Sequence, residues 1–400
     1  MAASRRKLTV VVAGAGPVGL LFATHVHRLQ IDCAVHVIDA RVPEPWRSSD
    51  VDARVYALSR ESQSYLGELW AAIAAHRASA YRRMCVFEGD DPDGASSITF
   101  DAADIGEPDL GHIVEDRLLR SVLLQGLAST GVETGFGLGL TALEQRAGRM
   151  RVALSDGTTL DADLVVGADG AESFVRSAAG IEVVRKDYAQ RALVSHVTTE
   201  KPHQETAWQR FLAEGPLAFL PLADGRSSIV WTNGVDRATH LLSLPDEDFL
   251  AELDAASAGA LGRIVACTSR CAFPLELKHA VRYTRPGVAL IGDAAHAVHP
   301  LAGQGMNLGL RDAVVLARTI AVAAAAGEYP GDEFVLRRYA RAQRAHNIGM
   351  QLAFDGINEL FGQRMSEWIG PLRRFGMQAV NSVAPARQML MRRAMGLDTA

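Results

Sequence analysis

A glycine-rich turn near the N-terminus constrains the fold of this chain more than any other feature. Gly14, Gly16 and Gly19 follow a short β-branched stretch at residues 8–12, and helical spacing continues over residues 18–29. In a strand–turn–helix unit, the first glycine permits a tight turn and the second lets the backbone approach an anion. The third lets the helix pack closely on the strand. The pattern therefore predicts a parallel α/β sheet that binds the pyrophosphate of a dinucleotide.

An aspartate at the end of the next predicted strand narrows the ligand. This strand covers residues 34–38 and is followed by Asp39. A carboxylate in this position accepts hydrogen bonds from ribose hydroxyls and repels a 2′-phosphate. A glycine-rich helix start that merely packs on a sheet would not account for Asp39. We expect an adenosine ribose there, with NAD and FAD both still open.

A second motif distinguishes between these two cofactors. Asp293 follows a predicted strand at residues 288–291, so it lies where an open α/β sheet binds ligands and can hold a ribityl hydroxyl of a flavin. Residues 299–307 then open a helix whose first amides would stabilise the reduced flavin pyrimidine. A loop that only caps the helix is the alternative. We expect FAD, with contacts in this region from Gly292, Asp293, Gly303, Gln304, Gly305, Met306 and Asn307.

The spacing of three blocks resembles the FAD-dependent aromatic hydroxylases of the para-hydroxybenzoate hydroxylase class. The blocks are the glycine turn, Asp169-Gly170 and Gly292-Asp293. In that class the Asp-Gly motif contacts both FAD and NAD(P)H, which implies this role for Asp169, Gly170 and Arg176. Arg54 matches the arginine of the class that contacts FAD, and a guanidinium suits a phosphate or ribose. Without the resemblance, Arg54 would be interpreted as a surface arginine.

Further blocks resemble the ubiquinone-biosynthesis hydroxylases within this class. They span nearly the whole chain, at residues 57–59, 215–222, 228–231, 299–312 and 391–397. One position departs from the family pattern, because Glu115-Asp116-Arg117 stands where the family usually has Glu-Asn-Arg. No site role is therefore transferred to Asp116.

The resemblance implies a reaction cycle. NAD(P)H reduces FAD, O₂ gives a flavin hydroperoxide, and its distal oxygen hydroxylates the ring of a polyprenylated phenol or benzoquinol. The protein would position the ring and exclude water. A base would activate the phenol, and His299 and His296 are candidates by position, with Pro300 beside His299. Structural hydrogen bonding at a helix start is the alternative for both histidines.

Other functions remain as alternatives. A hydroxylase of the same fold could act on a small soluble aromatic, for which a small polar pocket would be expected. A flavin-binding scaffold of a biosynthetic complex would show no NAD(P)H oxidation stimulated by an aromatic. A plain NAD dehydrogenase is the least favoured, because it leaves the blocks around Asp293 and Gln304 unexplained.

The fold class that we expect is α/β. It combines a Rossmann-like FAD-binding domain with an inserted antiparallel-sheet substrate domain and a helical C-terminal region. β-rich runs at residues 191–198, 217–222 and 227–232 indicate the inserted sheet. Its Phe219, Leu220, Pro221 and Trp231 are predicted to line the substrate pocket, with the apolar core of the sheet as the alternative. The predicted boundaries are 1–75, 106–180 and 281–332 for the FAD domain, 76–105 and 181–280 for the substrate domain, and 333–400 for the helical region.

Between these blocks, the spacing predicts helices over residues 58–75 and 117–128. It also predicts a hairpin of two strands at residues 150–154 and 160–166.

The net charge and the cysteine pattern indicate which partners and which cellular compartment to expect. A net charge of −5 gives no electrostatic case for a nucleic-acid partner. The four cysteines form no Cys-x-x-Cys pair and have no histidine at metal spacing, which predicts reduced thiols, no metal and a cytoplasmic setting.

The C-terminal region is basic, with ten arginines and four acids from Arg337 onward. That pattern suits an interfacial helix on anionic lipid, and so a peripheral membrane location. It equally suits a helix packed on the protein, on a second copy of the chain or on other ubiquinone-pathway proteins.

Overall fold

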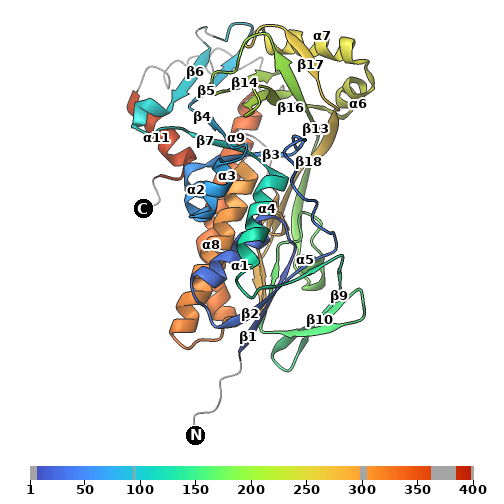
Figure 1. Cartoon of the computed structure of the whole chain (residues 1–400), viewed down its shortest axis with the longest axis vertical. Helices are drawn as coiled ribbons and strands as arrows, with labels where there is room; N and C mark the ends of the chain where they lie inside the picture. The colour runs from blue at the N-terminus through green and yellow to red at the C-terminus, as the bar shows by residue number, and fades with distance from the viewer. Residues whose placement is uncertain (1–6, 93, 95, 298–303, 362–383, 398–400) are drawn as a thin grey trace.

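The computed structural model describes residues 7–92, 94, 96–297, 304–361 and 384–397. Figure 1 shows an elongated molecule, with β1 and β2 toward its lower end and a second sheet, containing β5, β6 and β14–β18, at its upper end. The long strands β13 and β18 run from the upper sheet down toward α5. The α/β fold class expected from the sequence is confirmed.

The lower sheet has six strands in the order β19-β20-β12-β1-β2-β8, all parallel except β19. Their bounds are β1 Leu8–Ala13, β2 Cys33–Asp39, β8 Glu133–Phe136, β12 Leu164–Gly167, β19 Thr284–Arg285 and β20 Val288–Leu290. Every residue of β12 and β20 is buried, as expected of central parallel strands covered on both faces. The order places the carboxyl ends of β20, β12, β1 and β2 side by side.

Helices cover this sheet. α1 (Pro17–Arg28) starts with Pro17, whose missing N–H costs nothing at a first helical position, and it buries Leu20, Leu21 and Phe22. α8 (Gln304–Ala325) packs beside α1, and α9 (Glu333–Phe361) follows it. The remaining helices around the sheet are α2 Arg60–Leu66, α3 Leu69–Ala74, α4 Asp116–Leu127 and α5 Phe174–Ala178.

The upper sheet has nine strands, drawn from three separate parts of the chain. The order is β21-β18-β13-β16-β15-β14-β5-β6, with β17 also paired to β13. The bounds are β5 Arg83–Glu88, β6 Ser97–Asp101, β13 Val183–Thr199, β14 Thr206–Leu212, β15 Gly215–Pro221, β16 Ser227–Gly234, β17 Ile264–Cys267, β18 Cys271–Ala280 and β21 His296–Ala297. β5 and β6 come from the segment predicted at 76–105, and we keep the predicted domain boundaries as a working division. Two helices, α6 (Val235–Ser243) and α7 (Asp246–Ser257), share a hydrophobic core with one face of this sheet.

Two three-stranded sheets complete the fold. One has the order β3-β7-β4 and the other β11-β10-β9. The bounds are β3 Val55–Ser59, β4 Ser79–Tyr81, β7 Gly111–Glu115, β9 Leu140–Arg146, β10 Arg149–Leu154 and β11 Thr159–Ala162. The last described helix is α11 (Ala384–Ala394), and two 3₁₀ turns are η1 Ala102–Ile105 and η2 Gly292–Ala294.

Two predicted elements were wrong in detail. The strand expected at 160–166 is divided at Asp163, whose buried carboxylate accepts the Thr9 N–H at 2.7 Å. β11 therefore stays with β10, whereas β12 joins the parallel sheet. The helix expected at 58–75 starts only after Ser59, which ends β3 and caps α2, and Gly67 at φ +58° separates α2 from α3.

Candidate cofactor and substrate site

The glycine turn has the geometry that its spacing predicts. A Cβ on Gly14 (φ +110°) would lie 2.2 Å from the Ala168 carbonyl oxygen, and one on Gly19 would lie 2.2 Å from the Gly14 oxygen. A Cβ on Gly16 would instead meet no atom within 4 Å. Gly16 is also the N-cap of α1 and provides no side-chain cap for its first N–H groups. The helix start is therefore open for an anion beside Gly16.

Asp39 lies directly against this turn. Its Oδ2 accepts the Ala15 N–H at 2.7 Å, and its Oδ1 accepts the Arg41 N–H at 2.8 Å. The Gly14 N–H bonds to the Ile38 carbonyl at 2.7 Å, which joins the turn to the end of β2. The carboxylate is half-buried at the edge of the sheet.

The Asp169-Gly170 loop follows β12 beside the glycine turn. Asp169 Oδ2 accepts the Val175 N–H at 3.0 Å, whereas its buried Oδ1 has no hydrogen-bond partner among the described residues. Gly170 adopts φ +84° and has open space where a Cβ would lie. An orphaned carboxylate oxygen beside an open glycine is what a missing hydroxyl or amide donor would satisfy.

Arg176 connects two of the motif loops. Its guanidinium donates to the Ala171 carbonyl at 2.8 Å and to the Ala294 carbonyl at 3.0 Å, and the residue is only 3% exposed. Burial lowers the pKa of Arg176. The structure thus makes Arg176 a bridge between the Asp169 loop and η2.

The loop at Gly292–His296 is held by one buried carboxylate. Asp312 Oδ2 accepts the Gly292 N–H at 3.0 Å and lies 2.5 Å from His296 Nε2. Asp312 Oδ1 accepts Nδ2 of Asn347 at 3.1 Å. Burial alone would lower the pKa of His296, but the Asp312 carboxylate raises it. The His296 ring is therefore held by Asp312 inside the protein, at 1% exposure.

Asp293 projects from this loop with its carboxylate uncommitted. The residue is half-buried, and no hydrogen bond from a described residue reaches its carboxylate. α8 approaches the loop closely, because a Cβ on Gly309 would lie 3.2 Å from the Gly292 Cα.

Asn307 and Met306 fix the start of α8. Asn307 Oδ1 accepts the Ser59 N–H at 2.9 Å, and its Nδ2 donates to the Ala57 carbonyl at 2.8 Å. Met306 packs on the main hydrophobic core. The Asn307 amide is thereby used to join α8 to β3. His299, Pro300 and Gly303 lie outside the described residues, and Gln304 is described only as the first residue of α8.

Arg54 is an exposed residue beside the Tyr56 ring and near the carboxylates of Asp116 and Asp293. Its guanidinium carbon lies 5.5 Å from the Tyr56 ring centroid. Tyr56 raises the pKa of Arg54, as do the Asp116 and Asp293 carboxylates, against the opposing effect of burial. The Arg54 cation therefore stands near the Asp293 carboxylate, although the two residues adjoin different sheets.

Asp116, the departure from the family pattern, is neutralised locally. It is 7% exposed, accepts the Tyr56 hydroxyl at 2.8 Å and forms an ion pair with Arg120 at 2.8 Å. Burial raises the pKa of Tyr56 well above its ordinary value, so the hydroxyl stays protonated and donates. The extra negative charge is thus matched within α4 by Arg120.

The predicted substrate residues divide between the two faces of the upper sheet. Phe219 and Trp231 are 3% and 4% exposed and belong to the core beneath α6 and α7. Pro221 is buried two residues after Phe219, on the same face by alternation. Leu220 faces the other way and packs near Ala57. The apolar-core alternative therefore describes Phe219 and Trp231.

The opposite face of the nine-stranded sheet carries a row of apolar side chains that the sequence analysis did not consider. Ala218 pairs with Val230, which pairs with Val194, and these three apolar residues are half-buried in one row across β15, β16 and β13. The signal was available, because strict alternation does not allow Phe219 and Leu220 to face the same pocket.

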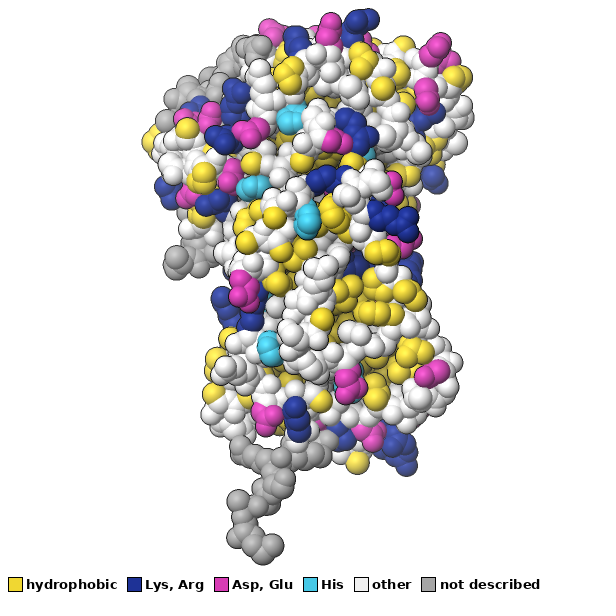
Figure 2. Space-filling view, in the orientation of Figure 1, with side chains coloured by type: hydrophobic (Ala, Val, Ile, Leu, Met, Phe, Trp, Pro, Cys, Tyr) yellow, Lys and Arg dark blue, Asp and Glu magenta, His cyan; other side chains and the backbone are white. Residues whose placement is uncertain are grey.

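The surface and the C-terminal segment provide further observations. Positive and negative side chains are interspersed on the face drawn in Figure 2. Among the described residues, no helix is long and apolar enough to cross a membrane, and no cluster of His, Cys, Asp and Glu has metal-binding geometry. All four cysteines are free thiols.

α11 packs on the protein rather than standing free. Met391 and Met395 are buried against Ala102 and Ile105, and Arg387 pairs with Asp104 at 2.9 Å. Residues 371–383 of the predicted interfacial region lie outside the described residues.

Comparison with known proteins agrees with this geometry. The fold is similar to that of p-nitrophenol 4-monooxygenase PnpA from Pseudomonas putida DLL-E4, with a TM-score of 0.78 and 17% identity, covering 97% of this chain and 98% of that one. The sequence model of the FAD binding domain family matches residues 7–348. The fold and the loops at one sheet edge thus define an FAD-dependent monooxygenase.

Proteins of similar sequence identify the family within this class. The chain is 36% identical over 395 residues to 3-demethoxyubiquinol 3-hydroxylase of Escherichia coli, covering 97% of this chain and 98% of that protein. It is also 36% identical over 390 residues to ubiquinone hydroxylase UbiL of Rhodospirillum rubrum, covering 97% and 89%. The chain belongs to the family of ubiquinone-biosynthesis hydroxylases, as its sequence blocks implied.

Proposed function

We propose that this enzyme uses NAD(P)H and O₂ to hydroxylate the ring of a polyprenylated phenol or benzoquinol in ubiquinone biosynthesis. The observation that carries the proposal is the meeting of four separate loops at one sheet edge, in a chain whose relatives over its full length are ubiquinone hydroxylases. Bound FAD supplies the electron-transfer and oxygen-activating chemistry. The protein's contribution is to bind, orient and shield.

The roles of the cofactor residues follow from their positions. The turn of Gly14, Gly16 and Gly19 would receive the pyrophosphate, and Asp39 the adenosine ribose. The free oxygen of Asp169, with Gly170 beside it, and the carboxylate of Asp293 would accept hydroxyl donors of the flavin side.

The remaining cofactor residues act at the flavin and phosphate ends. Arg54 would contribute its charge, and Arg176 would position the loops it bridges. At the flavin pyrimidine we place Gly303, Gln304, Gly305, Met306 and Asn307, the last two as positioning residues. NAD(P)H would bind transiently, since the sequence has one glycine fingerprint.

The substrate ring would lie against the row of Ala218, Val230 and Val194, with Leu220 at its edge. These small apolar side chains leave a flat wall, which suits a ring with an apolar substituent. His299 and Pro300 remain our candidates for activating the phenol.

The test is turnover by the purified FAD-loaded enzyme with two substrates, a polyprenylated phenol and its analogue without the prenyl chain. We expect NAD(P)H oxidation coupled to a product 16 mass units heavier with the first substrate. Faster coupled turnover with the analogue would favour the soluble-aromatic alternative. Oxidation that neither substrate stimulates would favour the scaffold.

A substitution pair tests the proposed wall. Ala218→Phe should raise KM for the polyprenylated phenol about tenfold or more by filling the wall, with the fold retained. Phe219→Leu should lower stability and leave KM within about twofold, because Phe219 lies in the core under α6 and α7. If Phe219→Leu raises KM and Ala218→Phe does not, the substrate pocket lies on the face of the sheet that carries Phe219 and Trp231.

Contact with a membrane surface belongs to the same proposal. Met389 on α11 is 60% exposed, whereas Met391 and Met395 are buried in the protein. Deleting residues 371–400 would therefore disturb packing as well as any lipid contact. Met389→Ser is the sharper variant: reduced binding to anionic liposomes is expected, and unchanged binding would leave α11 as a packed helix only.

A further inference from the structure

Asp52, two residues before Arg54, is a junction between the two halves of the molecule. Its Oδ1 accepts the Arg54 N–H at 3.1 Å, and its Oδ2 accepts the Arg117 N–H at 3.0 Å. Its own N–H donates to Glu115 Oε2 at 2.8 Å. Its carbonyl oxygen lies 2.9 Å from Nε2 of His196. All of its polar groups are therefore engaged in hydrogen bonds.

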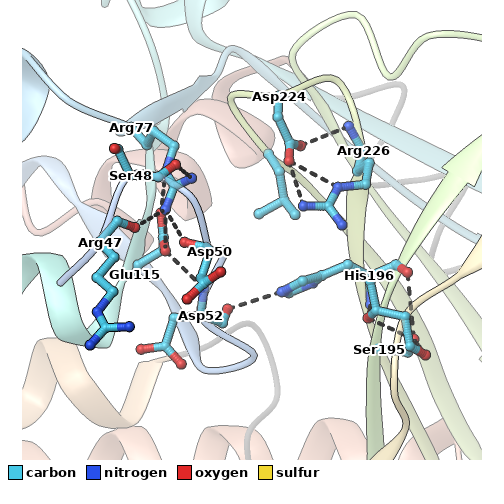
Figure 3. Close-up of polar contacts among 12 residues, drawn as sticks. Arg47, Ser48, Asp50, Asp52, Arg77, Glu115, Ser195, His196, Asp224 and Arg226 are labelled. Carbon is cyan, nitrogen blue, oxygen red and sulfur yellow. Dashed lines mark hydrogen bonds and ion pairs between the residues drawn. The ribbon is translucent and has the colours of Figure 1, made fainter. Parts of the chain in front are cut away.

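The partners come from different sheets. Glu115 ends β7 and Arg117 lies in the first turn of α4, both near the cofactor edge. His196 lies on β13 in the nine-stranded sheet, 144 residues from Asp52 in the chain. Figure 3 shows the imidazole reaching from the sheet across to the Asp52 carbonyl.

The segment before Asp52 is held rigidly on the cofactor side. Glu115 is 3% exposed and receives Arg77 Nε at 2.8 Å. The same guanidinium donates to the Ser48 carbonyl at 2.9 Å and to the Asp50 carbonyl, and it stacks on Trp46. A displacement at Asp52 would therefore move an ordered segment as a unit.

The chemistry of the His196 contact is unambiguous. A carbonyl oxygen only accepts, so Nε2 must carry the proton and the neutral tautomer is fixed. His196 is 3% exposed, and burial lowers its pKa, which keeps the ring neutral near Asp224 and Arg226. Losing the donor would leave the Asp52 carbonyl without this partner in a buried environment.

We propose that His196, on β13 of the nine-stranded sheet, is a positioning residue. It holds Asp52 by its backbone carbonyl and thereby orients Arg54. The proposal rests on the proposed role of Arg54 at the cofactor. Val194, two residues before His196, lies on the same face of β13 and in the proposed substrate wall. FAD affinity therefore depends on a side chain of the substrate sheet, and a ligand against Val194 acts on the same tether.

Two near-isosteric variants separate the hydrogen bond from the bulk of the ring. His196→Gln places an amide nitrogen where Nε2 lies, and His196→Asn places one where Nδ1 lies. The measurement is the Kd of FAD for each full-length variant, by flavin fluorescence. We expect about tenfold weaker binding for His196→Asn and less than about threefold for His196→Gln.

The control is another histidine–carbonyl bond at the same sheet. His203 Nε2 lies 3.1 Å from the Leu222 carbonyl and contacts neither Asp52 nor Arg54. His203→Asn should leave the Kd of FAD within about twofold. Equal effects of His196→Asn and His203→Asn on the Kd would overturn the proposal, because they would reflect general weakening of the sheet.

Arg54→Met distinguishes failure of this inference from failure of the cofactor assignment. If Arg54→Met weakens FAD binding, adding His196→Asn should weaken it by less than it does alone, since both act through Arg54. If the two substitutions change the Kd of FAD additively, His196 does not act through Arg54, while Arg54 keeps its proposed place at the cofactor. An unchanged Kd in Arg54→Met would remove the role of Arg54, and the His196 proposal with it. The turnover assay with the polyprenylated phenol tests the proposed function separately, because it does not depend on the Kd of FAD in these variants.

Discussion

Two segments that carry proposed cofactor residues are held in place by different kinds of contact. The loop with Asp293 is held by a buried pair, His296 and Asp312, which are 1% and 0% exposed. The segment with Arg54 is held by a neutral histidine on a backbone carbonyl. The first anchor joins β21, at the end of the nine-stranded sheet, to α8, and the second joins β13 of the same sheet to the segment before β3. The comparison teaches that both contacts reach out from the nine-stranded sheet, one as a buried histidine–carboxylate pair and the other as a neutral hydrogen bond to a backbone carbonyl.

The largest effect is expected at the buried pair. Asp312 accepts from Gly292, His296 and Asn347, so in Asp312→Asn an amide NH₂ must face a donor whichever way it is placed. The substitution also removes the carboxylate partner of the buried His296 ring. We expect a loss of about 3–5 kcal/mol in the free energy of unfolding by urea. Asp32→Asn, at an exposed position, should stay within about 0.5 kcal/mol. A loss below about 1 kcal/mol for Asp312→Asn would show that the pair is not the anchor.

Asn307→Leu should have the next largest effect, because it weakens the link between α8 and β3. It leaves the Ser59 N–H and the Ala57 carbonyl without the Asn307 amide, in residues that are 6% and 7% exposed. We expect about 2 kcal/mol lower stability, together with weaker FAD retention on gel filtration. Stability lost with FAD retention intact would remove Asn307 from the cofactor site and leave it in the core.

The two histidines should respond to pH in opposite directions. The pKa of His196 is lowered below the ordinary 6.5, so the unfolded chain takes up its proton first and stability falls as pH drops below about 6.5. The pKa of His296 is raised, so its contribution is full below 6.5 and is lost as pH rises through the folded value.

One substitution isolates the contribution of His196 to the loss of stability at low pH. His196→Gln should show a shallower loss of stability from pH 7.5 to 5.5 than the unmodified protein, by at most about 1.4 kcal/mol per pH unit. His25 and His112 also have lowered pKa values and are common to both proteins, so they cancel in the difference. Parallel pH curves would mean that His196 does not titrate in this window.

The smallest effect is expected at Tyr56. Tyr56→Phe removes one hydrogen bond to Asp116 but leaves the ion pair with Arg120. We expect about 1 kcal/mol lower stability and a change in FAD affinity of no more than about threefold. A larger change in affinity would place the Tyr56 hydroxyl in direct support of Arg54.

The parts that the sequence predicted well are those with local signatures. The glycine turn, Asp39 and the apolar strands carry their pattern within a few residues, so β1, β2 and α1 agree with the predicted elements to within about one residue at most ends. The burial of Phe219 and Trp231 under α6 and α7 did not follow from the sequence, because a period of two does not reveal which side of a strand the helices will cover.

The anchors could not be predicted for a different reason. His196 and Asp52 are 144 residues apart, and Arg77 acts on carbonyls 27–30 residues away. No local pattern distinguishes such a histidine or arginine from an ordinary core or surface residue. Asp312 and His296 did lie within sequence motifs, but the motifs did not indicate that the two side chains pair with each other and hold the loop.

The strand order of the parallel sheet also has a consequence for biosynthesis. β1 emerges from the ribosome first, but β20, which brings Asp293 to the same edge, follows only after the whole upper sheet except β21 has been made. Long-range parallel pairing of this kind forms late and slowly. The nascent enzyme must therefore keep its glycine turn without the complete flavin site through most of translation. We therefore expect FAD to bind only after β20 and α8 have been made and have joined the elements that precede them.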